Sequence, residues 1–90
     1  GEAEAIAKAL VDARLAACVN VTGVQSSYRW EGAVQNEPEQ LLIIKTQQSL
    51  LDTLIARIKG LHSYETPEII AMPIVGGYTP YLEWMREETG

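Results

Sequence analysis

The sequence has little of several residue types that mark particular classes of protein. It contains one cysteine among 90 residues, so no disulfide forms within the chain, and this favours a reducing compartment. Lysine and arginine number 7 against 12 acidic residues, and the formal net charge of −5 disfavours binding to nucleic acid or to anionic membranes. No apolar run approaches the roughly 20 residues of a membrane span. The acidic start, Gly1 to Glu4, is not typical of a signal peptide, so these absences predict a cytoplasmic location.

Motifs for the common cofactors are also missing. The sequence has no phosphate loop, no dinucleotide fingerprint and no CxxC pair, so ATP, NAD and structural zinc have no support. The glutamates are numerous, but their spacing is not typical of a glycosidase or an EF-hand. We therefore predict that the protein is not an enzyme.

What the sequence does contain is one domain, residues 1–90, that opens with a helix and a long hairpin. The Ala- and Leu-rich segment from Glu4 to Ala17 lacks glycine and proline and predicts a helix. Apolar alternation from Cys18 to Trp30 predicts a strand, and its change of phase at Gly23 predicts a β-bulge. Ala33 to Thr46 then predicts the returning strand of the hairpin.

Finer features of the hairpin follow from single residues. Glu31 and Gly32 supply the turn. Pro38 cannot donate a backbone hydrogen bond and marks either a bulge or an unpaired edge. The run from Leu41 to Ile44 is apolar on both faces, which is typical of a strand that is covered on both sides.

The second half of the chain predicts a helix, a short strand and a last helix. A capping box of Ser49 and Asp52 predicts the start of a second helix, whose end Gly60 favours. The apolar positions of that helix are Leu51, Leu54, Ile55, Ile58 and Leu61. Residues Pro67 to Ile74 predict a short strand, and Thr79 as N-cap predicts a last helix that continues to Glu88.

The predicted order of elements is therefore helix, strand, strand, helix, strand, helix. One strand ahead of the first helix would complete the βαββαβ order of a ferredoxin-like sandwich, followed by a C-terminal helix. We predict this α+β fold, with an antiparallel sheet, the long hairpin, and its first, central strand missing from the chain. That gap predicts either an absent N-terminal strand or another segment in its place.

Several stretches of the sequence resemble the CutA divalent-cation-tolerance family. They are residues Leu15–Asn20, Ser27–Gly32, Ile44–Thr46, His62–Ile69 and Tyr81–Trp84. The resemblance, which covers nearly all of Arg14 to Thr89, implies a ferredoxin-like protomer assembled as a homotrimer through the hairpin strands. It also implies a role in tolerance of copper and other divalent cations, without an established reaction. The trimers of this family resemble the P-II signalling proteins, which suggests sensing or regulation.

His62 is the candidate metal ligand. In some relatives a cysteine on the first strand and two adjacent histidines before the tyrosine are proposed to bind copper; here that strand is absent and the histidine pair reads Leu61-His62. Imidazole suits copper, nickel and zinc, but a stable site needs three or four ligands. His62 is therefore either a ligand for copper or another divalent cation, with further ligands drawn from other subunits, or a loop histidine bonded to solvent or backbone.

A second candidate site would suit a small anion rather than a metal. Its residues are Tyr28, Trp30, Lys45, Tyr64 and Glu65. Lys45 ends an apolar strand, where an ammonium needs a carboxylate, a carbonyl or an anionic ligand. The set therefore predicts either a ligand pocket between subunits or simple interface packing, with Lys45 reaching water.

Cys18, at the start of its strand, is most often a small buried residue, since catalysis would need His62 beside it. Three hypotheses follow: a metal-responsive or metal-binding homotrimer, a P-II-like sensor of small molecules, and a purely structural assembly.

Overall fold

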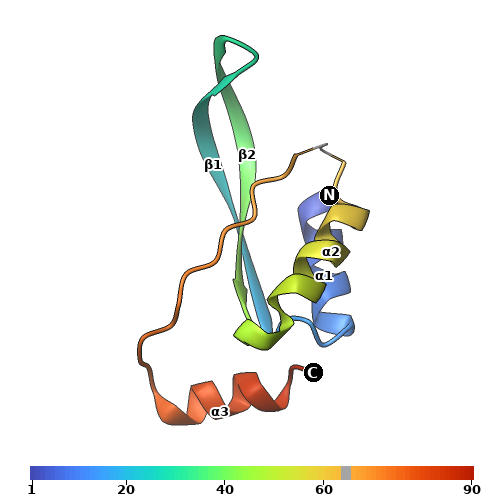
Figure 1. Ribbon diagram of the computed structural model, residues 1–90, viewed down its shortest axis with the longest axis vertical. Helices are drawn as coiled ribbons and strands as arrows, with labels where there is room; N and C mark the ends of the chain where they lie inside the picture. The colour runs from blue at the N-terminus through green and yellow to red at the C-terminus, as the bar shows by residue number, and fades with distance from the viewer. Residues whose placement is uncertain (64–65) are drawn as a thin grey trace.

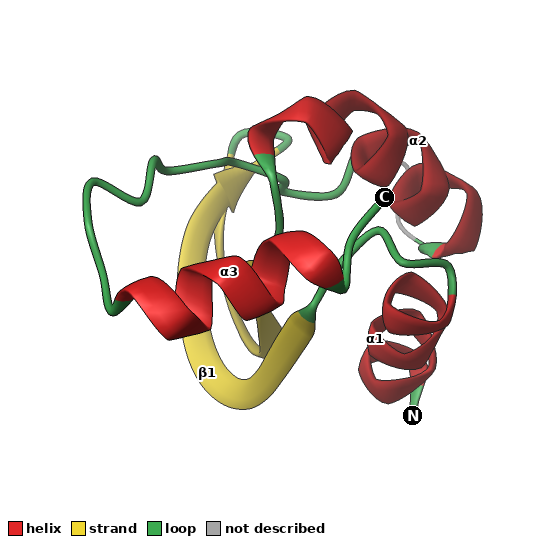
Figure 2. Cartoon of the chain, turned by 90° about the horizontal axis from the view of Figure 1, so that it is seen from below, coloured by secondary structure: helices red, strands yellow, loops and turns green. Residues whose placement is uncertain are grey.

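A computed structural model describes residues 1–63 and 66–90. The regular elements are α1 (Glu2–Asp12), β1 (Cys18–Trp30), β2 (Ala33–Lys45), the 3₁₀ turn η1 (Gln48–Leu50), α2 (Leu51–Leu61) and α3 (Thr79–Glu87). The two strands form an antiparallel hairpin that projects beyond the rest of the molecule, while α1 and α2 lie side by side against its lower half (Figure 1). Seen from below, α3 crosses the base, and the segment before it swings out on the side opposite α1 (Figure 2).

This arrangement confirms the α+β class and the long antiparallel hairpin of a ferredoxin-like sandwich. The helices α1 and α2 form one layer and the hairpin forms the other (Figure 1). Of the four strands in such a sandwich, the described residues form the two of the hairpin. The sheet therefore has a free edge on each side within the described part of the chain.

The predicted β-bulge at Gly23 is wrong. The strands pair without a break from Cys18 opposite Lys45 to Trp30 opposite Ala33. Gly23 stands opposite Gln40, and a Cβ added to it would meet only the Gln40 side chain at 3.8 Å. Pro38 pairs with Gln25 in the same register, so of its two predicted roles the unpaired edge is the one that fits.

The change of phase at Gly23 has another cause. Val19 and Val21 point to the helix side of the hairpin, where Val19 packs against the core. Beyond the helices the apolar residues move to the opposite face, which carries Val24, Tyr28 and Trp30, all exposed. The pattern therefore reflects a change in which face of the strand carries the apolar residues, and the strand itself continues unbroken.

The first helix ends five residues before the predicted Ala17. Arg14 adopts a left-handed backbone with φ of 60°, a conformation that stops the helix. The amide of Arg14 donates to the Val11 carbonyl and that of Leu15 to the Leu10 carbonyl, both at 3.0 Å, which is the hydrogen-bond pattern of a Schellman motif. Leu15 then packs back on Leu10 in the core. This tertiary contact overrides the helix propensity of the sequence from Ala13 to Ala17.

The ends of the other two helices also differ from the prediction. Ser49 lies in η1, and Leu50 is the N-cap of α2 without a side-chain hydrogen bond, so the capping box is not formed. Gly60 lies inside α2, which ends at Leu61. The N-cap of α3 is Tyr78 rather than Thr79, with Pro80 in the first turn and the helix ending at Glu87.

The position of α3 is set by hydrogen bonds at its C-terminal end. The Arg14 guanidinium donates to the carbonyls of Glu87 at 2.6 Å and Gly90 at 3.1 Å. Gln47 Nε2 donates to Thr89 Oγ1 at 2.8 Å, and Thr89 is buried. Met85 is the buried apolar residue of the helix. These contacts fasten α3 to the base of the hairpin.

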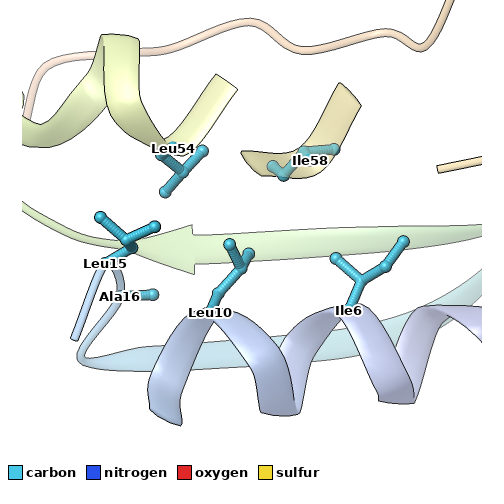
Figure 3. Close-up of a cluster of buried hydrophobic side chains, with 6 residues drawn as sticks. All are labelled: Ile6, Leu10, Leu15, Ala16, Leu54 and Ile58. Carbon is cyan, nitrogen blue, oxygen red and sulfur yellow. The ribbon is translucent and has the colours of Figure 1, made fainter. Parts of the chain in front are cut away.

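The core lies between α1, α2 and the lower half of the hairpin. Ile6 and Leu10 of α1 point toward Leu54 and Ile58 of α2, with Leu15 and Ala16 closing one end (Figure 3). The half-buried residues Val19, Leu42, Ile44 and Ile69 pack against this cluster. Only one face of the hairpin contributes to it, because odd positions of β1 and even positions of β2 share the helix side.

Residues Pro67 to Ile74 do not form the predicted strand. They run as an extended segment in which Ile69 reaches the core but Ile70, Met72 and Ile74 are exposed. A strand needs a neighbour to receive its backbone hydrogen bonds. Within residues 1–63 and 66–90, β1 and β2 pair only with each other, so the segment has apolar strand composition without a partner strand.

Candidate functional site

Lys45 and Cys18 face each other across the base of the hairpin. They are paired in the register, both are half-buried, and the Lys45 ammonium lies 3.9 Å from the Cys18 sulfur. The thiol also lies 4.0 Å from Asn20 Oδ1. In the described part of the chain no carboxylate pairs with Lys45. An ammonium held in this way remains available to an anion or a carboxylate from outside the protomer.

The pairing of Cys18 with Lys45 could have been derived from the sequence by counting residues outward from the turn. The turn contains only Glu31 and Gly32, both with positive φ, 50° and 81°, as a two-residue type I′ turn requires. Such a turn sets the register of every later pair, so Cys18 must stand opposite Lys45. The signal was missed because the bulge predicted at Gly23 would have shifted the register by one residue.

Tyr28 and Trp30 lie at the other end of the hairpin. Both are exposed, and they share the face that carries Lys45. Ten residues of strand at about 3.3 Å each separate Cys18 from Tyr28, which places Tyr28 roughly 33 Å from the base. One protomer therefore does not bring the aromatic pair together with Lys45. The predicted ligand set is split between two ends of the molecule.

His62 follows α2 and is half-buried. Its backbone is extended, and its amide donates to the Ile58 carbonyl at 2.8 Å. The next residue is tied to α1, because the amide of Ser63 donates to Glu2 Oε1 at 2.9 Å and its hydroxyl to Glu2 Oε2 at 3.2 Å. The predicted site residues Tyr64 and Glu65 lie outside the described residues. The clasp between Glu2 and Ser63 holds the start of the loop that carries His62.

Neither candidate site forms a complete metal centre in one chain. Over residues 1–63 and 66–90 no three His, Cys, Asp or Glu side chains cluster closely enough to hold an ion. Two shallow depressions lie along α2, one of about 410 Å³ beside Arg57 and one of about 260 Å³ between Lys59 and Pro67. Neither is lined by His62, Lys45, Tyr28 or Trp30.

The clasp between Glu2 and Ser63 gives a direct prediction. Glu2→Ala removes the acceptor of both hydrogen bonds, which are worth about 0.5–1.5 kcal/mol each at ordinary sites. We expect the Ser63 amide to exchange its hydrogen about two- to twelvefold faster, measured by NMR, while amides of the core exchange as before. The control is Glu4→Ala, which removes the other carboxylate from the first turn of the same helix. Equal protection of Ser63 in the two variants would contradict the assignment.

Comparison with known proteins identifies the family. The family model described as CutA1 divalent ion tolerance protein matches residues 1–88. "Divalent-cation tolerance protein CutA" from Thermus thermophilus is 52% identical over 89 residues, covering 98% of this chain and 86% of the relative. "Protein CutA, chloroplastic" from Arabidopsis thaliana is 51% identical over 85 residues, covering 93% of this chain and 47% of the relative. The chain belongs to the CutA1 divalent ion tolerance family, and it spans about half the length of its plant relatives.

Solved structures support the same fold. The divalent cation tolerance protein from Thermus thermophilus superposes with a TM-score of 0.96 at 51% identity, covering 99% of this chain and 87% of that chain. A structure described as the PII-like protein CutA from Nostoc sp. PCC 7120 gives a TM-score of 0.93 at 34% identity, covering 99% and 88%. The ferredoxin-like architecture predicted from the sequence is therefore that of the family.

The cytoplasmic location predicted from the sequence is contradicted by the names of these relatives. The Arabidopsis and rice proteins, each 51% identical, are named chloroplastic. A solved structure from Archaeoglobus fulgidus, with a TM-score of 0.95 at 40% identity over 97% of this chain and 85% of that chain, is described as periplasmic. A single cysteine and an acidic start do not determine where a domain of this kind works. In the described residues no helix has the length and apolar character to cross a bilayer.

Proposed function

We propose that this chain acts in divalent-cation tolerance as a homotrimer and that it does so without catalysing a reaction. The observation that carries the proposal is the family match over residues 1–88, together with the Thermus relative whose name states that role. The surroundings of Cys18 agree with a role other than catalysis, because its described neighbours are Asn20 and Lys45 rather than a histidine base.

The surface of the protomer supports assembly. Helices cover one face of the hairpin, and the other face exposes Val24, Leu41 and Ile43. The accessible area is 6608 Å², whereas a compact monomer of this mass exposes about 5,200 Å². The radius of gyration, 14.4 Å, likewise exceeds the roughly 12 Å of a compact chain of this length. The excess area of about 1,400 Å² is enough for a stable interface, which takes about 800 Å² from each partner.

Sedimentation tests the assembly directly. At micromolar concentration the protein should sediment with three times the mass of the chain, with no monomer boundary. A stable monomer under these conditions would remove the homotrimer from the proposal. Binding of a divalent cation by the single chain would still be tested by calorimetry.

For the metal, we propose that His62 is a ligand for copper or another divalent cation. The described residues of one chain offer no group of three ligands, so the remaining ligands would come from other copies of the trimer. Imidazole and carboxylate together suit divalent copper and zinc. The acidic composition, with 12 acidic residues against 7 basic ones, favours cations near the surface.

Calorimetry with the tag-free protein tests the metal proposal. Cu²⁺ or Zn²⁺ should bind the trimer, and His62→Ala should weaken that binding at least tenfold, because one of three or four ligands is lost. The matched control is Cys18→Ser, which removes the one thiol at the distant base of the hairpin and should leave the affinity unchanged. If the native chain binds no metal above background, direct binding should be abandoned.

A second function is favoured by Lys45. Its half-buried ammonium, with no carboxylate partner in the described residues, suits a small anionic ligand. The Nostoc relative described as PII-like supports a sensor of this kind. We propose it as the alternative to metal binding. A trimer that binds neither metal nor anion would favour the third hypothesis, a structural assembly protein.

A thermal-shift panel of nucleotides and small anions separates these functions. A ligand present at about 100 times its Kd stabilises by about 2.7 kcal/mol, which raises the Tm of so small a domain by about 10 °C. Lys45→Met should abolish the rise. Lys59→Met, which removes the same charge from an exposed position on α2, should keep it. No shift for any compound in the panel would count against the sensor.

A further inference from the structure

Cys18 and Lys45 form a pair of nucleophilic side chains at the base of the hairpin. The Lys45 nitrogen lies 3.9 Å from the Cys18 sulfur, and both side chains are half-buried. Cys18 is the one thiol of the chain, and no carboxylate among the described residues pairs with Lys45. Two groups that can each attack a carbonyl carbon therefore stand side by side.

The backbone around this pair is held by hydrogen bonds. The unbroken register sets Cys18 opposite Lys45. The amide of Ala17 donates to the Lys45 carbonyl at 2.9 Å. The Thr46 hydroxyl donates to the carbonyl of Leu15 at 2.7 Å, and both Leu15 and Ala17 are buried. The two reactive side chains therefore start from fixed positions on neighbouring strands.

We propose that Lys45 is a site of acylation and that Cys18 delivers the acyl group to it from a small acyl thioester. First the Cys18 sulfur attacks the thioester carbonyl, a new carbon–sulfur bond forms, and the donor thiol leaves with the proton that Cys18 gives up. The Lys45 ammonium releases one proton to water, and its amine then attacks the same carbonyl. The amide bond forms, the bond to sulfur breaks, and a second proton passes from the nitrogen to the Cys18 sulfur. Nothing is oxidised or reduced.

The separation of the two atoms suits this transfer. A carbonyl carbon bonded to the Cys18 sulfur can lie between it and the Lys45 nitrogen, at about the 3–3.5 Å from which a held nucleophile attacks. Groups positioned in this way react far faster than the same groups free in solution. The product is an amide, which is more stable than a thioester, so the acyl group moves from sulfur to nitrogen.

The modification goes beyond the functions proposed above and depends on none of them. Each chain is acylated once and Lys45 is consumed, so the step is a modification of the protein and gives no turnover. Acylation replaces the ammonium with a neutral amide. The charge on which the alternative anion site rests is thereby lost.

Peptide mapping by mass spectrometry tests the transfer, with S-acetyl-N-acetylcysteamine as the acetyl thioester. The other lysines, Lys8 on α1 and Lys59 on α2, are exposed and serve as internal controls. Although Lys45 is half-buried, it should gain an acetyl group at least about tenfold faster than Lys8 or Lys59. Cys18→Ser should remove this advantage at Lys45 and leave the rates at Lys8 and Lys59 unchanged.

Lys45→Arg provides the complementary measurement, because it keeps a cation beside the thiol and removes the amine that accepts the acyl group. The acetyl group should then remain on Cys18 as a thioester that hydroxylamine removes, whereas the amide on Lys45 of the native chain resists hydroxylamine. Circular dichroism and sedimentation check that each variant keeps the fold and the assembly of the native protein.

The comparison of the lysines in the native protein needs no variant. Acetylation of Lys45 no faster than that of Lys8 and Lys59 would overturn the proposal. So would an unchanged rate at Lys45 in Cys18→Ser, or Lys45→Arg chains that carry no thioester on Cys18. A trimer that binds metal or a small anion as proposed above would be unaffected by any of these results.

Discussion

Replacing Leu10 with alanine is expected to lower the free energy of unfolding by about 2–5 kcal/mol, because the change opens a cavity in the centre of the core. Leu10 is fully buried, at 0% exposure, and points from α1 toward Leu54 of α2 (Figure 3). Leu15, the residue that follows the left-handed turn at Arg14, also packs against Leu10. The loss would take a large share of the 5–15 kcal/mol that stabilises a typical domain.

Urea denaturation at one fixed protein concentration measures this effect, since assembly makes stability depend on concentration. The control is Val11→Ala, which deletes apolar atoms from the neighbouring residue of the same helix. Val11 is 41% exposed, so its replacement should change the stability by no more than about 0.5 kcal/mol. If both variants unfold at the same urea concentration, the placement of Leu10 at the centre of the core is wrong.

Replacing Ile43 with lysine is expected to dissociate the proposed trimer. Ile43 is 50% exposed in the single chain and lies on the face of the hairpin that α1 and α2 leave bare. In the single chain a lysine there meets water and costs little. In an assembly that covers this face it must be desolvated, and we expect a loss of about 2–4 kcal/mol for each interface, which is about 30- to 1,000-fold in affinity.

Analytical ultracentrifugation at micromolar concentration measures the result, and circular dichroism checks that the dissociated chain keeps its helices. Val11→Lys introduces the same charge on the exposed side of α1 and should leave the trimer intact. Should Ile43→Lys sediment as the native protein does, the bare face of the hairpin is not part of the interface.

The sequence predicted most elements because their signals are local. The hairpin needed only apolar alternation and a two-residue turn, and the second helix needed only apolar residues at helical spacing. The ends of the helices were less well predicted, and the reason differs from case to case. α1 stops where Leu15 turns back to pack on Leu10, and α2 begins through a 3₁₀ turn instead of the capping box at Ser49. Such ends are decided by contacts from other parts of the chain.

The candidate sites could be predicted only as separate residues. Lys45 could be predicted as a candidate because an ammonium at the end of an apolar strand needs a polar or charged partner. Its position opposite Cys18 follows from the strand register that the two-residue turn sets. That Tyr28 and Trp30 lie at the far end also follows from strand geometry. The Glu2–Ser63 clasp beside His62 has no signal in the sequence, because the two residues meet only when α1 and α2 pack together.

The low content of cysteine excluded a disulfide within the chain, and the low content of basic residues argued against binding to nucleic acid. The cytoplasmic location predicted from these absences was wrong. By itself the sequence determined the α+β class, the hairpin and the helical faces, since apolar periodicity and turn chemistry act over a few residues. The tertiary structure alone decided that residues Pro67 to Ile74 stay unpaired and that one face of the hairpin is bare. These features depend on which segments meet in space, and contacts between segments far apart in the chain leave no local pattern in the sequence.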